Sequence, residues 1–272
     1  MKSELFDIDD KIIVISGATG VLGSAITAYL AGQGARVVAM GRNTDKVNAL
    51  IKEIKGTRHK VFPLIADVTD EQDLVRAKSK LENEFGKIDV LINLAGGNMP
   101  GAVITPEQTL LDARTDEINK VMVLNYMGSF LPIKTFLPLF LKDLKGSIIN
   151  ISSMAAQRPI TRVLGYGSAK AAIDNLTKWL AIEFCSKHSA ELRVNAVAPG
   201  FFLTEQNRTL LTEANGRLTK RGNQIIANTP MGRFGNPDEL FGVLHWLISD
   251  ASKFVTGTII PVDGGFNAYS GV

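Results

Sequence analysis

Tyr166 and Lys170 stand four residues apart in the sequence Tyr-Gly-Ser-Ala-Lys. On a helix this spacing places both side chains on one face, one turn apart, so that both can reach the same reacting oxygen. A free phenol, with a pKa of about 10, is a poor proton carrier at neutral pH, and a nearby ammonium favours the phenolate and lowers that pKa. The pair therefore predicts general acid–base chemistry at an oxygen atom, with Tyr166 as the proton carrier.

A hydroxyl group precedes this pair and completes a possible reaction centre. Ser153 directly follows the strand-like run at residues 148–152 and lies 13 residues before Tyr166. Its hydroxyl can hydrogen-bond to a substrate carbonyl and polarise it for hydride attack. A Tyr-x-x-x-Lys pair alone is common on protein surfaces, but together with this hydroxyl it favours the interconversion of a carbonyl and an alcohol.

A glycine-rich turn follows the first strand-like run and opens a helical one. Glycine permits tight turns and close backbone approach, and a helix N-terminus offers free N–H groups to a pyrophosphate. This context predicts a dinucleotide-binding turn. The turn comprises Gly17, Thr19, Gly20, Val21, Leu22 and Gly23.

The second strand-like run ends at Arg42 and Asn43, with no acidic residue there, and we expect both residues to contact the cofactor. An acid at this position holds the ribose 2′-hydroxyl of NAD, whereas a guanidinium suits the 2′-phosphate of NADP. We expect an NAD(P)(H) cofactor, with NADP(H) slightly favoured because of Arg42.

Short apolar runs alternate with longer amphipathic segments along the whole chain. This rhythm predicts one α/β domain over residues 1–272, a Rossmann fold with a seven-stranded parallel, doubly wound sheet. The ligand then lies beyond the carboxyl ends of the strands. We expect strands at 12–16, 36–40, 61–66, 90–93, 147–152, 193–198 and 258–262, helices at 21–33, 44–55, 71–85, 116–144, 165–187 and 237–249, and a substrate loop or helical insertion at about 200–235.

Two details concern the helices. Pro132 and Pro138 fall within the fourth helical segment, which we expect to be kinked or split there. Cys185, the single cysteine, lies in an apolar helical run and is interpreted as a small core residue.

The composition limits the class of protein. The 272 residues include 30 basic and 27 acidic side chains, a net charge of +3 that does not indicate a nucleic-acid partner. With one cysteine no intrachain disulfide is possible, and neither a signal peptide nor a membrane-length apolar run is visible. We expect a cytoplasmic protein without membrane or metal partners.

Further motifs follow the remaining strands. They are Asp67-Val68, Asn93-Leu94-Ala95-Gly96, Asn125 in the next helix, Pro199-Gly200 and Asp263-Gly264-Gly265. With the glycine turn and the Ser153/Tyr166/Lys170 set, they resemble the short-chain dehydrogenase/reductase family over essentially the whole chain. One departure is the middle glycine, Gly20, which the single-domain branch usually carries at the position of Val21.

This resemblance implies roles for the individual residues. Ser153 orients the substrate, Tyr166 is the acid and base, Lys170 tunes it, and Asn125 holds a water in a proton relay. Cofactor contacts are implied for Asp67 and Val68 at the adenine, Asn93, Ala95 and Gly96 along the cofactor, and Pro199, Gly200 and Thr204 over the nicotinamide and phosphates. A homotetramer is implied as well, with the helices at 116–144 and 165–187 and the C-terminal tail forming interfaces.

The loops that choose the substrate in this fold are rich in amide and guanidinium groups. Such groups bind hydroxyls and a carboxylate rather than a steroid or fatty-acyl chain. Candidate contacts are Asn98, Arg158, Gln206 and Arg208. The stretches at 96–101 and 199–208 resemble the D-mannonate oxidoreductase (fructuronate reductase) branch, which implies reduction of D-fructuronate.

Other interpretations remain open. The substrate could be another polar ketone: a ketose, a polyol partner or a 3-oxoacyl thioester. A non-catalytic dinucleotide sensor would have no use for a proton donor, and a sugar-nucleotide epimerase is supported by the glycine spacing alone.

Overall fold

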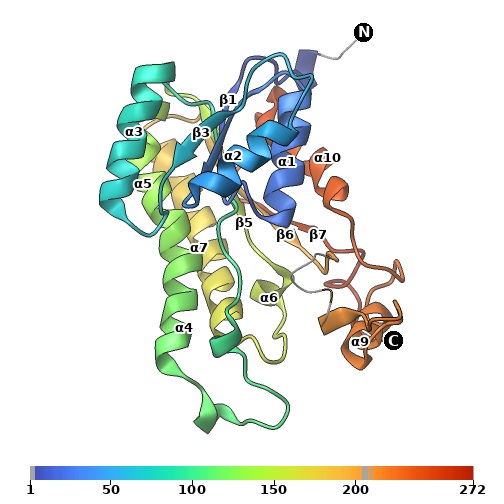
Figure 1. The fold of residues 1–272 in the computed structure, drawn as a ribbon. Coiled ribbons are helices and arrows are strands. Elements are labelled where there is room, and N and C mark those ends of the chain that lie inside the picture. Colours follow the sequence, from blue (N-terminus) through green and yellow to red (C-terminus); the bar gives the residue numbers. More distant parts are fainter. Residues whose placement is uncertain (1–3, 204–207, 209, 272) are drawn as a thin grey trace.

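A parallel sheet forms the centre of the molecule (Figure 1). The computed structural model describes residues 4–203, 208 and 210–271. Its seven strands are all parallel, as the sequence predicts, and their order in the sheet is β3-β2-β1-β4-β5-β6-β7. They are β1 (Ile12–Ser16), β2 (Arg36–Gly41), β3 (Phe62–Ile65), β4 (Val90–Asn93), β5 (Gly146–Ile151), β6 (Leu192–Pro199) and β7 (Ile259–Val262).

Helices cover both faces of this sheet. On one face lie α3 (Glu71–Phe85), α5 (Gly128–Phe140) and α7 (Leu164–Lys187), and on the other α1 (Val21–Gly32), α2 (Thr44–Glu53) and α10 (Phe241–Ile248). The remaining helices are α4 (Thr115–Met122), α6 (Met154–Gln157) and α9 (Lys220–Ala227), with short 3-10 turns at Glu4–Phe6, Pro100–Ala102, Leu110–Asp112, Pro237–Leu240 and Asp250–Ser252.

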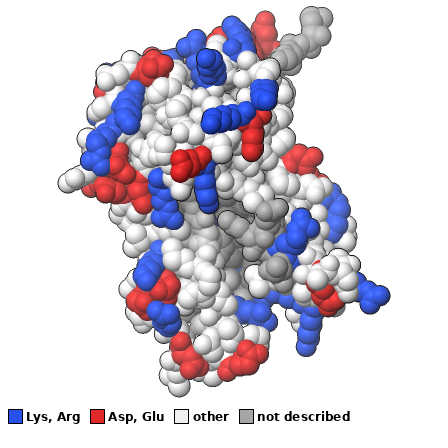
Figure 2. Space-filling view, in the orientation of Figure 1, with Lys and Arg blue, Asp and Glu red and all other residues white. Residues whose placement is uncertain are grey.

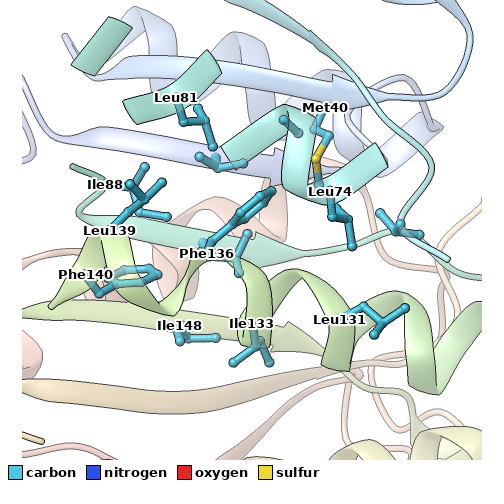
Figure 3. Packing of buried hydrophobic residues seen from close by; sticks show 14 of the residues in the cluster. Met40, Leu74, Leu81, Ile88, Leu131, Ile133, Phe136, Leu139, Phe140 and Ile148 are labelled. Carbon is cyan, nitrogen blue, oxygen red and sulfur yellow. The ribbon is translucent and has the colours of Figure 1, made fainter. Parts of the chain in front are cut away.

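The alternation of side chains along each strand explains the two layers. In β1, Ile12 and Val14 face the core of α3, α5 and α7, whereas Ile13 and Ile15 face the core of α1, α2 and α10. Strands covered on both faces are apolar throughout, because both sets of side chains are removed from water. Figure 3 shows the first core, in which Phe136 packs close to Leu74 and Met40.

The strand order reverses between β1 and β4, which are neighbours in the sheet. The Ser16 hydroxyl at the end of β1 accepts hydrogen bonds from the backbone N–H groups of Leu94, at 3.1 Å, and Ala95, at 3.2 Å. It thereby fastens together the two strand ends between which a ligand binds in this class of sheet.

The fourth helical segment is interrupted, but not at its prolines. α4 passes into a π-helical turn, Val123–Met127, and then into α5, which contains both Pro132 and Pro138. At this turn the Asn125 amide donates to the backbone oxygen of Val121 at 2.9 Å, so a side chain occupies an acceptor that a backbone N–H would otherwise use. The expected split at the prolines was therefore wrong, because the interruption lies ahead of Pro132, while a kink within α5 stays a prediction.

The structure also shows which apolar residues of α5 and α7 are buried in the core. Phe136 and Phe140 are fully buried between α5 and the sheet and belong to the core. Cys185 is exposed, which contradicts the expectation of a core residue, because Ala181 and Phe184 occupy the inward-facing positions of this part of α7.

The segment expected to carry substrate contacts lies beyond β6. Its two ends meet where the Gly235 N–H donates to the Phe201 oxygen at 2.9 Å, and α9 lies between them. Within the residues that the structure describes, no helix is both long and apolar enough to cross a membrane.

Candidate active site

The glycine turn between β1 and α1 is shaped by close backbone contacts. Gly17 has a φ of +68°, and a Cβ atom there would lie 2.8 Å from the backbone of Ala95. A Cβ on Gly23 would lie 2.2 Å from the Gly17 carbonyl oxygen. Both positions therefore require glycine, and the turn is packed against the end of β4.

The first turn of α1 is open to a ligand. Gly20 is the N-cap, so no side chain caps the helix, and the first turn carries no acidic residue. Its free N–H groups and the positive end of the helix dipole can accept an anion. The presence of Val21 in place of a glycine does not disturb this arrangement, because Val21 is already the first helical residue.

One cavity of about 500 Å³ joins this turn to the predicted reaction centre. It runs along the carboxyl ends of the strands, where Figure 2 shows a hollow between the upper and lower parts of the molecule. Of the residues expected to act, its lining includes Gly17, Thr19, Gly20, Val21, Leu22, Arg42, Asp67, Val68, Ala95, Gly96, Ser153, Tyr166, Lys170, Pro199 and Gly200.

Ser153, Tyr166 and Lys170 come together at one end of this cavity. Ser153 caps α6, its oxygen accepting from the Ala155 N–H at 3.1 Å, and its hydroxyl is hydrogen-bonded to Tyr166. The Lys170 amine lies 5.7 Å from the centre of the Tyr166 ring and donates to the Ile151 carbonyl oxygen at 2.6 Å. The strand end of β5 and the first turns of α7 thus hold the three groups in one place.

Burial shifts the pKa values of both Tyr166 and Lys170. Burial raises the pKa of Tyr166 above 10.0, and the hydrogen bond with Ser153 offsets only part of this. Burial also lowers the pKa of Lys170 from 10.5 to about 8, against the opposing charge of Asp174. The expected lowering of the Tyr166 pKa was wrong for this structure, because desolvation of the phenolate outweighs the nearby ammonium.

Asn125 lies beside the reaction centre in the π-helical turn. Its side-chain oxygen accepts from the Gly97 N–H at 3.0 Å, and its amide donates to the Gly97 carbonyl at 2.8 Å. A Cβ on Gly96 would lie 2.5 Å from that side-chain oxygen and 3.4 Å from the Lys170 amine. Asn125 therefore holds the loop after β4 against Lys170, and its role in holding a water stays a prediction.

Arg42 and Asp67 lie at the other end of the cavity. Their charged groups are 3.7 Å apart, and 75% of the Arg42 side chain is exposed. Burial alone would raise the pKa of Asp67, but hydrogen bonds from Thr69 and the charge of Arg42 lower it overall. Asn43 does not line the cavity; its side chain caps α2 by accepting from the Lys46 N–H at 2.9 Å.

Several other expected residues lie outside the cavity lining. Asn93 is buried and donates to the Asn150 side-chain oxygen at 2.9 Å, and Gly23 packs behind the glycine turn. The Asn98 side-chain oxygen is shielded from solvent without a described hydrogen-bond partner. Arg158 is half-buried and Arg208 is exposed, while Thr204 and Gln206 lie outside the described residues.

Sequence reasoning missed some residues of the site. Phe201 and Phe202 line this cavity and a neighbouring one of about 380 Å³. Asp174, one helical turn beyond Lys170, accepts a hydrogen bond from the Ser152 hydroxyl. The spacing of Asp174 from Lys170 was a usable signal, since an i, i+4 acid faces the same side of a helix.

The described residues fit a dinucleotide. The cavity begins at a turn where a Cβ on Gly17 would collide with the backbone of Ala95, passes uncapped helix N–H groups, and ends at Tyr166, the predicted proton carrier. The glycine turn and α1 would hold the pyrophosphate. The loop with Asp67 and Val68 would contact the adenine, and Lys170 would bind the ribose next to the nicotinamide.

Comparison with known proteins agrees with this arrangement. A family model described as enoyl-(acyl carrier protein) reductase matches residues 17–267. The uncharacterized oxidoreductase UxuB of Bacillus subtilis is 44% identical over 271 residues, which cover 96% of each chain.

Two solved structures share the fold over almost the full length. A candidate D-mannonate oxidoreductase from Haemophilus influenzae with bound NAD has a TM-score of 0.90 and 40% identity, covering 98% of each chain. Gluconate 5-dehydrogenase from Burkholderia cenocepacia, in complex with NADP and tartrate, has a TM-score of 0.85 and 29% identity, covering 97% of this chain and 98% of that chain.

The family match spans nearly all of the chain, and its relatives are oxidoreductases that share the whole sheet. This chain therefore belongs to the short-chain dehydrogenase/reductase family, the NAD(P)-dependent oxidoreductases that act on hydroxyl and carbonyl groups.

Proposed function

We propose that this enzyme reduces the ketone of a sugar acid, with D-fructuronate as substrate and D-mannonate as product. The observation that carries the proposal is the single cavity that joins the glycine turn to Ser153, Tyr166 and Lys170. A relative of 40% identity is described as a candidate D-mannonate oxidoreductase, and a gluconate 5-dehydrogenase structure holds tartrate, another hydroxy acid.

The basic residues on and just before α9, in the segment beyond β6, support an anionic substrate. Arg217, Lys220 and Arg221 lie on or just before α9, and Figure 2 shows basic side chains on the part of the molecule that carries this helix. Guanidinium groups bind carboxylates by paired hydrogen bonds. We retain Asn98, Arg158, Gln206 and Arg208 as proposed substrate contacts.

A nicotinamide nucleotide held along this cavity would supply the hydride for reduction. The chain's own groups handle the proton and the carbonyl. Ser153 donates a hydrogen bond to the substrate carbonyl and orients it, and Tyr166 delivers a proton to the oxygen as it becomes an alcohol. Burial raises the pKa of Tyr166, so the phenol stays protonated at neutral pH and is ready to act as the acid in the reductive direction.

A substrate panel tests the proposal. Hexuronates, aldonates, simple ketoses and an acetoacetyl thioester are each assayed with both nicotinamides, by following nicotinamide absorbance. D-Fructuronate reduction with the highest kcat/KM supports the proposal. If a ketose or a thioester is reduced with a higher kcat/KM, the proposed substrate is wrong, but the proposed carbonyl reduction stands.

A paired substitution tests the chemistry. Tyr166→Phe should lower kcat by about 10²–10⁴-fold and leave nucleotide binding intact, because only the transferable proton is lost. The matched control is Tyr29→Phe, which removes a phenol that hydrogen-bonds to His245 at 2.9 Å on the opposite face of the sheet. Full activity of Tyr166→Phe would disprove the assigned role.

The cofactor preference and the assembly are separate proposals. We propose NADP(H) over NAD(H), because Arg42 is the basic residue that lines the adenine end of the cavity, and its side chain is mostly exposed. We also propose a homotetramer, with the exposed apolar side chains of α7 at an interface.

A further inference from the structure

Asp174 lies in α7, on the same face of the helix as Tyr166 and Lys170. Positions 166, 170 and 174 are each one turn apart, so Tyr166, Lys170 and Asp174 lie on the same side of the helix. Asp174 is half-buried, and its carboxylate accepts a hydrogen bond from the Ser152 hydroxyl at the end of β5. A carboxylate is thus held beside the proton carrier by the same strand end that presents Ser153.

Lys170 is surrounded mainly by neutral groups. Only 4% of the residue is exposed, and its amine donates to the Ile151 carbonyl and lies near the Tyr166 ring and the Asn125 amide. Burying an ammonium among neutral groups disfavours its charged form. Asp174 is the described acid whose negative charge opposes this effect.

A chain of hydrogen bonds runs from Asp174 to the C-terminal turn. The Gln157 side chain at the end of α6 is hydrogen-bonded to the Asp174 carboxylate. The Asn267 amide donates to the Gln157 side-chain oxygen at 2.7 Å, and the Asn267 N–H donates to Asp263 at 2.7 Å. The residues that follow β7 are therefore connected to the helix row of the reaction centre.

We propose that Asp174 is a positioning residue, whose carboxylate keeps Lys170 positively charged and, through Ser152 and Gln157, ties that charge to the C-terminal turn. The inference rests on the proposed function only in its use of Lys170 as a charged group beside Tyr166. It is independent of which carbonyl compound is the substrate.

The groups around both side chains define the pH range of this effect. Burial raises the pKa of Asp174, and Ser152, Lys178, Gln157 and Lys170 lower it in part. The charge of Lys170 is lost as the pH rises through about 8. Removing the negative charge of Asp174 should therefore move the loss of the Lys170 charge to lower pH.

The test is the alkaline limb of the pH profile in Asp174→Asn, which keeps the shape and a hydrogen-bond acceptor for Ser152 but removes the charge. The pH at which kcat/KM falls on the alkaline side should be about one unit lower than in the wild type. Activity should then be about tenfold lower at about pH 9 and nearly unchanged at about pH 6. Asp174→Glu, which restores a carboxylate, should return the limb toward the wild-type position.

The matched control is Glu183→Gln on the same helix. Glu183 pairs with Lys187 at 2.9 Å, away from the reaction centre, so its loss should leave the limb in place. Thermal unfolding of each variant separates a loss of fold from a change in charge. If Asp174→Asn does not fold, Asp174→Ser carries the same expectation, because it is also neutral.

A second readout does not depend on turnover. The dissociation constant of the reduced nicotinamide nucleotide, followed by its fluorescence against pH, should rise at lower pH in Asp174→Asn than in the wild type. The inference is overturned if both the limb and the binding profile of a folded Asp174→Asn coincide with those of the wild type. Absence of any carbonyl reduction by the wild type, with the binding shift present, would instead refute the proposed function alone.

Discussion

Lys170 and Tyr166 are both held by burial closer to their neutral forms than in water. The Tyr166 phenol thereby remains a proton donor, while the Lys170 amine titrates near the pH of the cell, at about 8. A group poised near the working pH can change charge during a reaction at small cost. The proposed reaction centre should therefore be sensitive to pH through its lysine.

The shifted lysine should be visible in the stability of the fold. Its pKa is about 8 in the folded chain and 10.5 when unfolded, so between these values the unfolded chain binds more protons and the free energy of unfolding rises with pH. Relative to Lys170→Met, which cannot titrate, the wild type should gain about 2 kcal/mol between about pH 7.5 and about pH 10. Urea unfolding of both proteins at the two pH values measures this difference. Parallel pH dependences would show that Lys170 is not depressed.

Arg42 governs the choice between nicotinamide cofactors in our proposal. Arg42→Ala should raise the KM for NADP about tenfold, the loss of one charge-assisted hydrogen bond of about 1.5 kcal/mol, and leave the KM for NAD nearly unchanged. Steady-state kinetics with each cofactor measure both values. Arg36→Ala is the control, because Arg36 begins the same strand and pairs with Asp10 at 3.3 Å. An equal effect of Arg42→Ala on both cofactors would contradict the proposal.

At the scale of elements, α1 provides two glycines with opposite expectations. Gly23→Ala places a Cβ 2.2 Å from the Gly17 oxygen, so it should distort the turn, weaken nucleotide binding and lower the melting temperature. Gly32 on the same helix has no atom within 4 Å of its Cβ position, and Gly32→Ala should stabilise the fold by about 0.5–1 kcal/mol. Calorimetric melting and nucleotide titration distinguish the two. Unchanged nucleotide binding in Gly23→Ala would mean that the turn tolerates the collision.

The helices and strands also show how much of the fold and of the candidate site can be predicted from the sequence. β1 and β4 were predicted with their observed bounds, because strands buried on both faces are continuous apolar runs. The gathering of Ser153 with Tyr166 and Lys170 follows from strand ends and helix periodicity, which are local patterns.

What the sequence could not predict depends on contacts between distant segments. The π-helical turn at Val123–Met127 accompanies the bonds of Asn125 to Val121 and Gly97, and Asp174 gains its importance from Ser152 and Gln157. The roles suggested for Asn43 and Asn93 were drawn from their neighbourhood in the sequence. In the structure their side chains cap a helix and join two strands.

At the scale of the whole molecule, α7 presents apolar side chains to solvent as well as to the core. Trp179 is 55% exposed and Ile182 is 71% exposed. In the proposed homotetramer they are covered, so the wild type should have about four times the 29.4 kDa mass of one chain in light scattering. Ile182→Glu should give smaller particles. Leu111→Glu, at a residue 96% exposed on the Leu110–Asp112 turn, should not, and a monomeric wild type would refute the assembly.

The bond between the ends of β1 and β4 has a consequence for biosynthesis. Gly17 packs against the backbone of Ala95, and the Ser16 hydroxyl accepts hydrogen bonds from the N–H groups of Leu94 and Ala95. These partners are translated far later than the glycine turn. Contacts so distant along the chain close slowly and only after the intervening helices have emerged. A growing polypeptide therefore has the glycine turn long before the proposed nucleotide site is complete, and added cofactor should not protect the nascent chain from proteolysis until β4 has left the ribosome.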